Sequence, residues 1–150
     1  MNVGDKAPEV LGVNEQGEQI LLSHYRGKKV VLYFYPKDNT SGCTAEACSL
    51  RDNYSALKDK GYEVIGVSVD SADSHKKFIE KHELPFTLIA DTDKLLVNEM
   101  GVWGEKSMYG RQYRGTFRTT FVIDEEGVIE KVFSPKEVKT KTHGEQLLAL

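Results

Sequence analysis

The chain holds only two cysteines, Cys43 and Cys48, which lie five positions apart in a sequence of 150 residues. A soluble domain of this length can bury a hydrophobic core without the help of a disulfide. In a reducing compartment, such a close pair is therefore more typical of catalytic, redox or metal-binding chemistry than of a structural bond. The pair is the first candidate for a functional site.

Cys43 is expected in the first turn of a helix that follows the carboxyl end of a buried strand. The free N–H groups and the positive dipole end of a helix favour an anion there, so they favour the thiolate over the thiol. Thr40 is the expected N-cap, with its hydroxyl close to the first-turn N–H groups or to the sulfur. Gly42 would let a substrate oxygen approach the backbone closely. This setting predicts a nucleophile, although an isolated buried cysteine is more often a small core residue.

Cys48 is expected about 140° around the same helix from Cys43, away from its apolar face. It would lie beside Thr44, Arg51 and Ser55, where a core role explains a cysteine poorly. Together the two residues predict a nucleophilic sulfur with a second thiol nearby on an accessible face.

A metal-binding redox sensor built on the two thiolates is an alternative of a different class. A tetrahedral zinc site would need further soft ligands, and the chain has no second cysteine pair to supply them. The four histidines form no tight ligand spacing and are expected on the surface: His24, His75, His82 and His143. No metal is therefore expected.

Strands and helices are predicted to alternate along the chain. Apolar runs rich in β-branched and aromatic residues predict buried strands at 29–35, 62–69 and 86–90. Apolar residues at helical spacing predict helices at 41–60, at 72–83, at 94–100 with Asp93 as the cap, and at 143–150. Two apolar segments around a turn glycine, 118–123 and 128–133, predict a β-hairpin.

This order of elements predicts an α/β domain with a mixed central β-sheet and helices on both faces. No repeat or linker divides the sequence, so residues 1–150 are expected to form a single domain. The balance of 20 basic and 23 acidic residues gives no reason to expect a nucleic-acid or anionic-membrane partner. Residues 1–6 contain no apolar signal-peptide core and no stretch approaches the length of a membrane span, so a cytoplasmic protein is expected.

One segment resembles a known family. Pro36, Thr40 and Cys43 match the Pro-x-x-x-Thr-x-x-Cys signature of peroxiredoxins, and the longer stretch with Glu46 and Cys48 is similar to the Q-type, or bacterioferritin comigratory protein, subfamily. Further similar segments run from 4–8 to 118–124, so the resemblance covers nearly the whole chain. Ser41 stands where the family commonly has proline, which removes a residue that would fix φ at the helix start.

The resemblance implies a thioredoxin-like fold with an N-terminal hairpin and a peroxidase that needs no cofactor. It implies that Cys43 attacks hydrogen peroxide or an organic hydroperoxide, and that Cys48 resolves the product as a Cys43–Cys48 disulfide. Thioredoxin or a similar dithiol would be the reductant. A monomer is expected, with a weak homodimer as the alternative, because the resolving cysteine is in the same chain.

Two further roles follow from the resemblance. Arg118 matches the family's active-site arginine and would keep the thiolate ionised, with Arg51, Arg111 and Arg114 as rival candidates. Glu46 is similar to a glutamate that hydrogen-bonds near this arginine, and an acid solvated on the helix surface is an equally good interpretation. Trp103 and Tyr109 either line a contact surface or pack in the core.

A thiol-disulfide oxidoreductase of the same fold is a further alternative, but such proteins normally carry Cys-x-x-Cys, whereas four residues separate these cysteines.

Helix geometry constrains the expected Cys43–Cys48 disulfide. Residues five apart on an intact helix have Cα atoms about 8.7 Å apart, whereas a disulfide usually needs them within about 6.8 Å. Oxidation must therefore unwind the helix start or join two chains, and local unwinding is the expected outcome.

Overall fold

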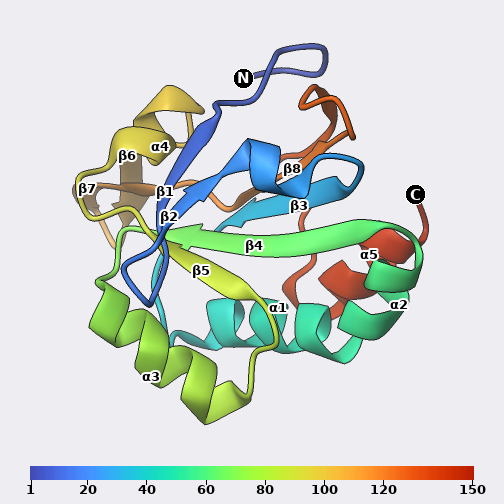
Figure 1. Cartoon of the computed structure of the whole chain (residues 1–150). Coiled ribbons are helices and arrows are strands. Elements are labelled where there is room, and N and C mark those ends of the chain that lie inside the picture. The colour runs from blue at the N-terminus through green and yellow to red at the C-terminus, as the bar shows by residue number, and fades with distance from the viewer.

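Five strands form the central sheet of the computed structural model, which describes residues 1–150 (Figure 1). Their order is β5-β4-β3-β8-β9, and the bounds are β3 Lys29–Phe34, β4 Tyr62–Ser68, β5 Thr87–Ala90, β8 Thr119–Ile123 and β9 Ile129–Phe133. The first three run parallel, whereas β8 pairs antiparallel with both β3 and β9. The expected mixed sheet and the hairpin of its last two strands are confirmed.

Apolar side chains of β3 alternate between the two faces of the sheet. Val31 and Tyr33 belong to a cluster that also holds buried residues of α1 (Ser41–Asp52), α2 (Tyr54–Asp59), α3 (Ala72–His82) and α5 (His143–Leu148). Val30, Leu32 and Phe34 belong to a second cluster with buried residues of β1 (Val10–Val13) and α4 (Leu95–Glu99). One face is therefore covered by four helices and the other by α4 and β1, so both faces of this strand are buried, as its continuous apolar run predicts.

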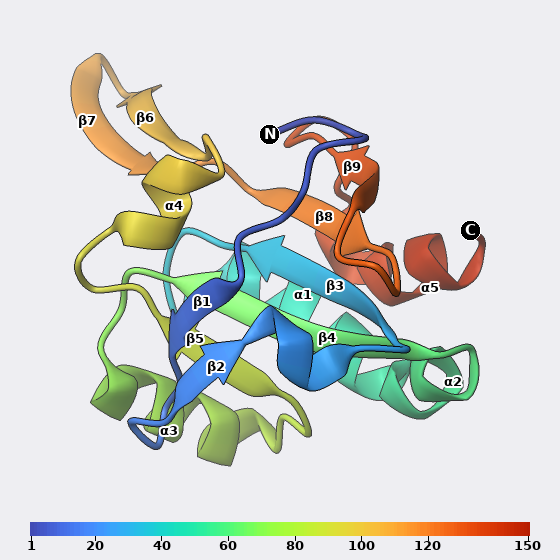
Figure 2. The ribbon, with the colours of Figure 1, turned by 45° about the horizontal axis from the view of Figure 1, so that its top comes forward.

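Two hairpins flank the sheet. The expected N-terminal hairpin consists of β1 and β2 (Gln19–Leu21) and leads into a short 3₁₀ helix, Leu22–Tyr25. A hairpin absent from the sequence-based prediction, β6 (Trp103–Met108) and β7 (Arg111–Thr116), projects away from the sheet in Figure 2. Trp103 packs against the second apolar cluster, whereas Tyr109 at the turn is 97% exposed, so core packing is wrong for Tyr109.

The helix predicted at 41–60 is two helices that meet at Asn53. The Asn53 side chain donates a hydrogen bond to the carbonyl of Ser49, 2.8 Å away, and the backbone N–H of Gly144 donates to the Ser49 hydroxyl at 2.9 Å. A Cβ atom on Gly144 would lie only 2.6 Å from the Ser49 carbonyl oxygen. The close approach of α5, which helical periodicity does not reveal, accompanies this break.

The cap predicted for the fourth helix is also wrong. Asp91, at the end of β5, accepts hydrogen bonds from the N–H groups of Leu96 and Val97, and Asp93 does not cap the helix. Lys94 adopts a left-handed conformation with φ 60° and is the N-cap residue. The helix therefore begins at Leu95, where Asp91 can accept its N-terminal N–H groups.

A 3₁₀ turn at Thr140–Thr142 precedes α5. No helix in the chain has the length and apolar character that a membrane span requires.

Candidate active site

Cys43 lies in the first turn of α1, and its side chain is 1% exposed. Antiparallel pairing places Thr119, at the start of β8, opposite Phe34 at the end of β3. This register brings Arg118 beside the loop that leads into α1, and its Nη2 atom lies 3.2 Å from the Cys43 sulfur. The fold thus brings the Arg118 guanidinium into contact with the Cys43 sulfur, although the two residues are 75 positions apart in the sequence.

Glu46 binds the other arm of the same guanidinium. Arg118 Nη1 donates to Glu46 Oε1 at 2.7 Å, and the carboxylate is fully buried. Gly42 faces the guanidinium from the helix start, where a Cβ atom would lie 3.2 Å from Arg118 Nη2. Glu46 is therefore the partner of the arginine rather than a solvated acid, and Gly42 leaves the arginine room to reach both groups.

None of the rival arginines donates a hydrogen bond to Cys43. Arg51 donates to Asp52 and to the carbonyl of His82, and Arg111 and Arg114 are exposed on the β6–β7 hairpin. Among the four candidates, the structure brings Arg118 to Cys43.

Thr40 is the N-cap residue of α1, but its side chain does not cap the helix. Its hydroxyl donates instead to the carbonyl of Lys37 at 2.8 Å, which closes the turn before the helix. The prediction that the hydroxyl reaches the first-turn N–H groups or the sulfur is therefore wrong for this conformation. Those N–H groups have no intrahelical acceptor and stay open to a peroxide oxygen or another anion.

A hollow of about 280 Å³ lies beside the site and is lined by both apolar and basic side chains. Pro36, Trp103 and Tyr113 are among its lining residues, together with Lys106 and Thr116. Burial lowers the pKa of Lys106, and so does the charge of Arg118, while the charge of Cys43 opposes them. The charges of Lys106, Arg118 and Cys43 therefore influence one another.

Cys48 is half-buried on α1, and both cysteines are free thiols. The helix is continuous from Ser41 to Asp52, so the two sulfurs cannot bond without a change in its backbone. The Cys43 sulfur already accepts a hydrogen bond from a guanidinium, which is a poor neighbour for a metal cation. The geometry of this pair therefore favours thiol chemistry over a zinc site.

Two histidines that were expected on the surface, His75 and His143, are fully buried. His143 Nε2 lies 2.9 Å from the hydroxyl of Thr120 and 3.9 Å from Glu46 Oε2. His75 lies on the buried side of α3, three residues before the core residue Phe78. That helical spacing was the signal available for His75, whereas the burial of His143 depends on contacts with α1 and β8.

Burial sets the ionisation of Glu46. Its pKa is raised to about 7 because burial penalises the charged carboxylate, while the charge and hydrogen bond of Arg118 oppose this effect. Its second oxygen, Oε2, is buried without a hydrogen-bond partner. The residue therefore favours a proton when folded more than a solvated glutamate does.

Glu46→Gln is expected to remove one pH dependence of stability in the reduced protein. The pKa of Glu46 in the folded protein, about 7, lies above its ordinary value of 4.5. The contribution of the protonated carboxyl to the free energy of unfolding is therefore fully present below pH 4.5 and is lost as pH rises through 7. Relative to that of wild type, the free energy of unfolding of the Glu46→Gln variant should therefore rise by about 3 kcal/mol as pH increases across this range. Urea unfolding of both proteins at several pH values measures the difference, and a difference that stays constant would contradict the assignment.

Comparisons with known proteins agree on one family. A profile of the AhpC/TSA family matches residues 3–132. Peroxiredoxin Bcp of Escherichia coli is 43% identical over 148 residues, which cover 99% of this chain and 94% of that protein. Peroxiredoxin Bcp of Bacillus subtilis is 45% identical over 143 residues, which cover 95% and 90%.

Solved structures of similar fold lead to the same group. A cysteine-to-serine mutant of Xylella fastidiosa PrxQ has a TM-score of 0.90 and 33% identity, and the match covers 99% of this chain and 94% of that one. A Xanthomonas campestris bacterioferritin comigratory protein, described for its alkyl peroxide reduction activity, has a TM-score of 0.84 and 33% identity, with 97% and 96% covered.

Proposed function

This chain belongs to the AhpC/TSA family and, within it, to the Bcp peroxiredoxins, which makes it a thiol-dependent peroxidase; from that premise we propose that Cys43 is the attacking nucleophile and Cys48 the resolving thiol. The observation that carries this assignment is the contact of 3.2 Å between Arg118 Nη2 and the Cys43 sulfur at an open helix N-terminus. A fixed positive charge and free N–H groups stabilise a thiolate there.

In the first step, the Cys43 thiolate attacks the terminal oxygen of a hydroperoxide. An S–O bond forms, the O–O bond breaks, and Cys43 becomes a sulfenic acid. The leaving oxygen departs as hydroxide or alkoxide and takes a proton to become water or an alcohol. Arg118 stabilises the negative charge first on sulfur and then on the departing oxygen, because its two arms present donors in a fixed plane.

In the second step, the Cys48 thiolate attacks the sulfenic sulfur of Cys43. A disulfide forms, and the hydroxide that leaves takes a proton to become water. Because α1 holds the two Cα atoms about 8.7 Å apart, the start of this helix must unwind before the S–S bond forms. Ser41 lacks the proline ring that would stiffen this start.

A dithiol reductant of the thioredoxin type closes the cycle. One donor thiolate attacks the disulfide, and the second donor thiol then releases the reduced enzyme and becomes oxidised with the first. Since both cysteines are in one chain, the cycle needs no second subunit, and a monomer suffices. The chemistry fits the cytoplasm, where such thiols are kept reduced.

Organic hydroperoxides are proposed as substrates together with hydrogen peroxide. The hollow beside Pro36, about 280 Å³ in volume and lined in part by Trp103 and Tyr113, offers apolar surface for an alkyl group. A coupled assay with several peroxides, run with thioredoxin and with glutaredoxin, ranks the substrates and the donors.

Cys48→Ser is expected to keep the first attack and to accumulate sulfenic acid at Cys43, because the resolving thiol is gone. Dimedone, which labels sulfenic acids, should then mark Cys43 stoichiometrically after one equivalent of peroxide. In the wild type, the same treatment should give a monomer with Cys43 joined to Cys48 by peptide mapping and with loss of helix signal at about 40–51. A covalent dimer as the main product, or an oxidised protein with α1 intact, would refute this route.

A further inference from the structure

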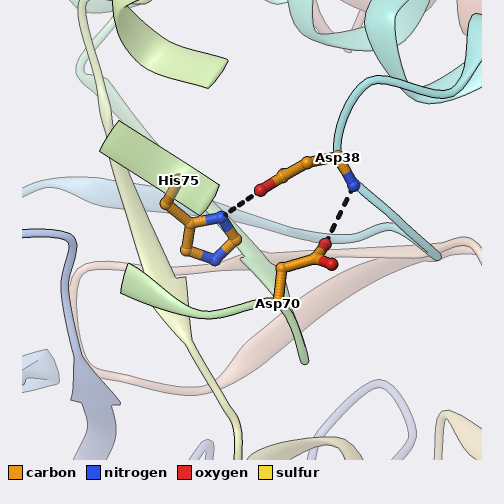
Figure 3. A group of neighbouring side chains, drawn as sticks. All are labelled: Asp38, Asp70 and His75. Carbon is orange, nitrogen blue, oxygen red and sulfur yellow. Dashed lines mark hydrogen bonds and ion pairs between the residues drawn. The ribbon is translucent and has the colours of Figure 1, made fainter. Parts of the chain in front are cut away.

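A buried carboxylate holds the loop between β3 and α1. Asp38, two residues before the N-cap of α1, accepts hydrogen bonds from the hydroxyls of Tyr35 at 2.6 Å and Ser74 at 2.8 Å. Its Oδ2 atom also lies 2.8 Å from Nδ1 of the fully buried His75, which projects from α3 toward it (Figure 3). The carboxylate therefore joins the loop before Cys43 to α3, a helix that contributes to the same apolar cluster as α1.

Both ring nitrogens of His75 lie within hydrogen-bond distance of an oxygen acceptor. Its Nε2 atom lies 2.9 Å from the carbonyl oxygen of Ile89, which can only accept a hydrogen bond, and its Nδ1 atom faces Asp38. Burial alone would raise the pKa of Asp38, but the hydrogen bonds and charge of His75 and the hydroxyls of Tyr35 and Ser74 lower it below its usual range. Both ring nitrogens thus face acceptors, and a doubly protonated, charged ring satisfies both contacts.

The loop backbone is anchored as well. The N–H of Asp38 donates to Asp70 Oδ2 at 2.9 Å (Figure 3). The Ser68 hydroxyl donates to the same oxygen at 2.7 Å. Ligand atoms of Asp38, Asp70 and His75 lie within 4.8 Å of one another, as in some metal sites. Because hydrogen bonds within the protein already engage these groups, the cluster is explained as an anchor and needs no ion.

Directly after this anchor no side chain caps the helix. Asn39 adopts a left-handed conformation with φ 63°, and Thr40 makes no capping bond to α1. The start of the helix is therefore held by Asp38 and not by its own cap. A second anchor lies further along, where the Ser49 hydroxyl accepts the N–H of Gly144 at 2.9 Å. The two anchors enclose residues 39–48, which include both cysteines.

We propose that the Asp38–His75 ion pair is a positioning device that keeps the Cys43 thiolate in its attacking position and sets the N-terminal limit of the segment that unwinds. The inference rests on the proposed disulfide cycle and assigns roles to two residues outside its chemistry. On oxidation, residues 39–48 rearrange, while Asp38 stays bound to His75 of α3 and the Ser49 hydroxyl stays hydrogen-bonded to the N–H of Gly144.

The length of the segment allows this rearrangement. A helix from Ser41 to Ser49 spans about 12 Å, whereas the same residues can cover about 27 Å when extended. The unwound chain therefore has slack between fixed ends, enough to bring the Cys43 and Cys48 sulfurs together. An anchor at Asp38 also keeps β3 and its neighbours in register while the helix start moves.

Asp38→Asn tests the proposal because it removes the charge with little change in shape. Amides of residues 44–47 in the reduced variant, the first that donate helical hydrogen bonds in α1, should exchange hydrogen at least about tenfold faster than in wild type, while those of β3 and α3 keep their protection. The rate of peroxide attack should fall by about tenfold, since the thiolate is less often in position. Disulfide formation should be as fast as in wild type or faster, because unwinding is easier.

Asp124→Asn is the matched control. Like Asp38, Asp124 is a carboxylate in a turn that follows a strand, and it accepts hydrogen bonds from the backbone N–H groups of Glu126 and Val128. It lies directly after β8, at the end of this strand opposite to Arg118. This variant should leave exchange at 44–47 and both rates unchanged. Adding His75→Gln to Asp38→Asn should change the two rates little further, because the partners act as one unit.

Three results would overturn the proposal. They are exchange at 44–47 equal to wild type in Asp38→Asn, attack and disulfide formation that slow by the same factor, or additive effects of the two substitutions. The exchange experiment uses the reduced protein, so it does not depend on the role of Cys48. If wild-type protein instead formed no Cys43–Cys48 disulfide, the proposed cycle would fail, while the exchange result would still decide whether the anchor exists.

Discussion

Replacement of Cys43 by serine is expected to abolish peroxide turnover. The serine hydroxyl is nearly isosteric with the thiol and can still accept the hydrogen bond from Arg118 that the sulfur accepts at 3.2 Å. It is not ionised at neutral pH, however, and peroxide cleavage requires the thiolate. Peroxide consumption with a thioredoxin-type donor should therefore fall to the level of the donor system alone.

The control for this loss is the Cys48→Ser variant, which keeps the nucleophile. In single-turnover experiments that follow peroxide loss, this variant should consume one equivalent at the wild-type rate, and Cys43→Ser should consume none. Dimedone should label only the variant that retains Cys43. Equal first-attack rates in wild type and Cys43→Ser would transfer the nucleophilic role to Cys48.

Arg118→Ala is expected to slow the attack on peroxide by about 10² to 10³, or about 2.7 to 4 kcal/mol of transition-state stabilisation. The substitution removes the donors that contact the Cys43 sulfur at 3.2 Å and Glu46 at 2.7 Å. The fold should persist, because the guanidinium contributes no apolar core and Glu46 can take up a proton once its partner is lost. Stopped-flow measurement of the attack, with circular dichroism as the check on folding, decides the outcome.

Two further arginine variants sharpen that test. Arg118→Lys keeps a positive charge but loses the planar fork, so it should recover only part of the rate. Arg111→Ala removes an exposed arginine of the β6–β7 hairpin and should react as wild type does. An Arg118→Ala rate within about twofold of wild type, with normal folding, would move the role to Arg111 or Arg114.

Sequence alone determined the buried strands of the sheet, most of the helices and the two thiols. The apolar runs that become β3 and β4 are buried on both faces, so their hydrophobicity identifies them without any tertiary information. The position of Cys43 in the first turn of α1 follows from the strand before it and the helical spacing after it, both of which are local signals. The mismatch between the helix and a Cys43–Cys48 disulfide likewise needs only the rise and turn per residue.

The tertiary structure alone decided which distant groups meet these thiols. Arg118 reaches Cys43 because β8 pairs antiparallel with β3, whereas in the sequence only the family resemblance distinguished it from three other arginines. His75 is buried because Asp38 and the carbonyl of Ile89 satisfy both of its ring nitrogens. The hydroxyl of Thr40 turns to Lys37 for a local reason, a competing backbone acceptor three residues before it. Propensity and periodicity describe neighbours along the chain, whereas the contacts of Arg118 and His75 depend on strand register and on which polar groups find partners when the layers pack.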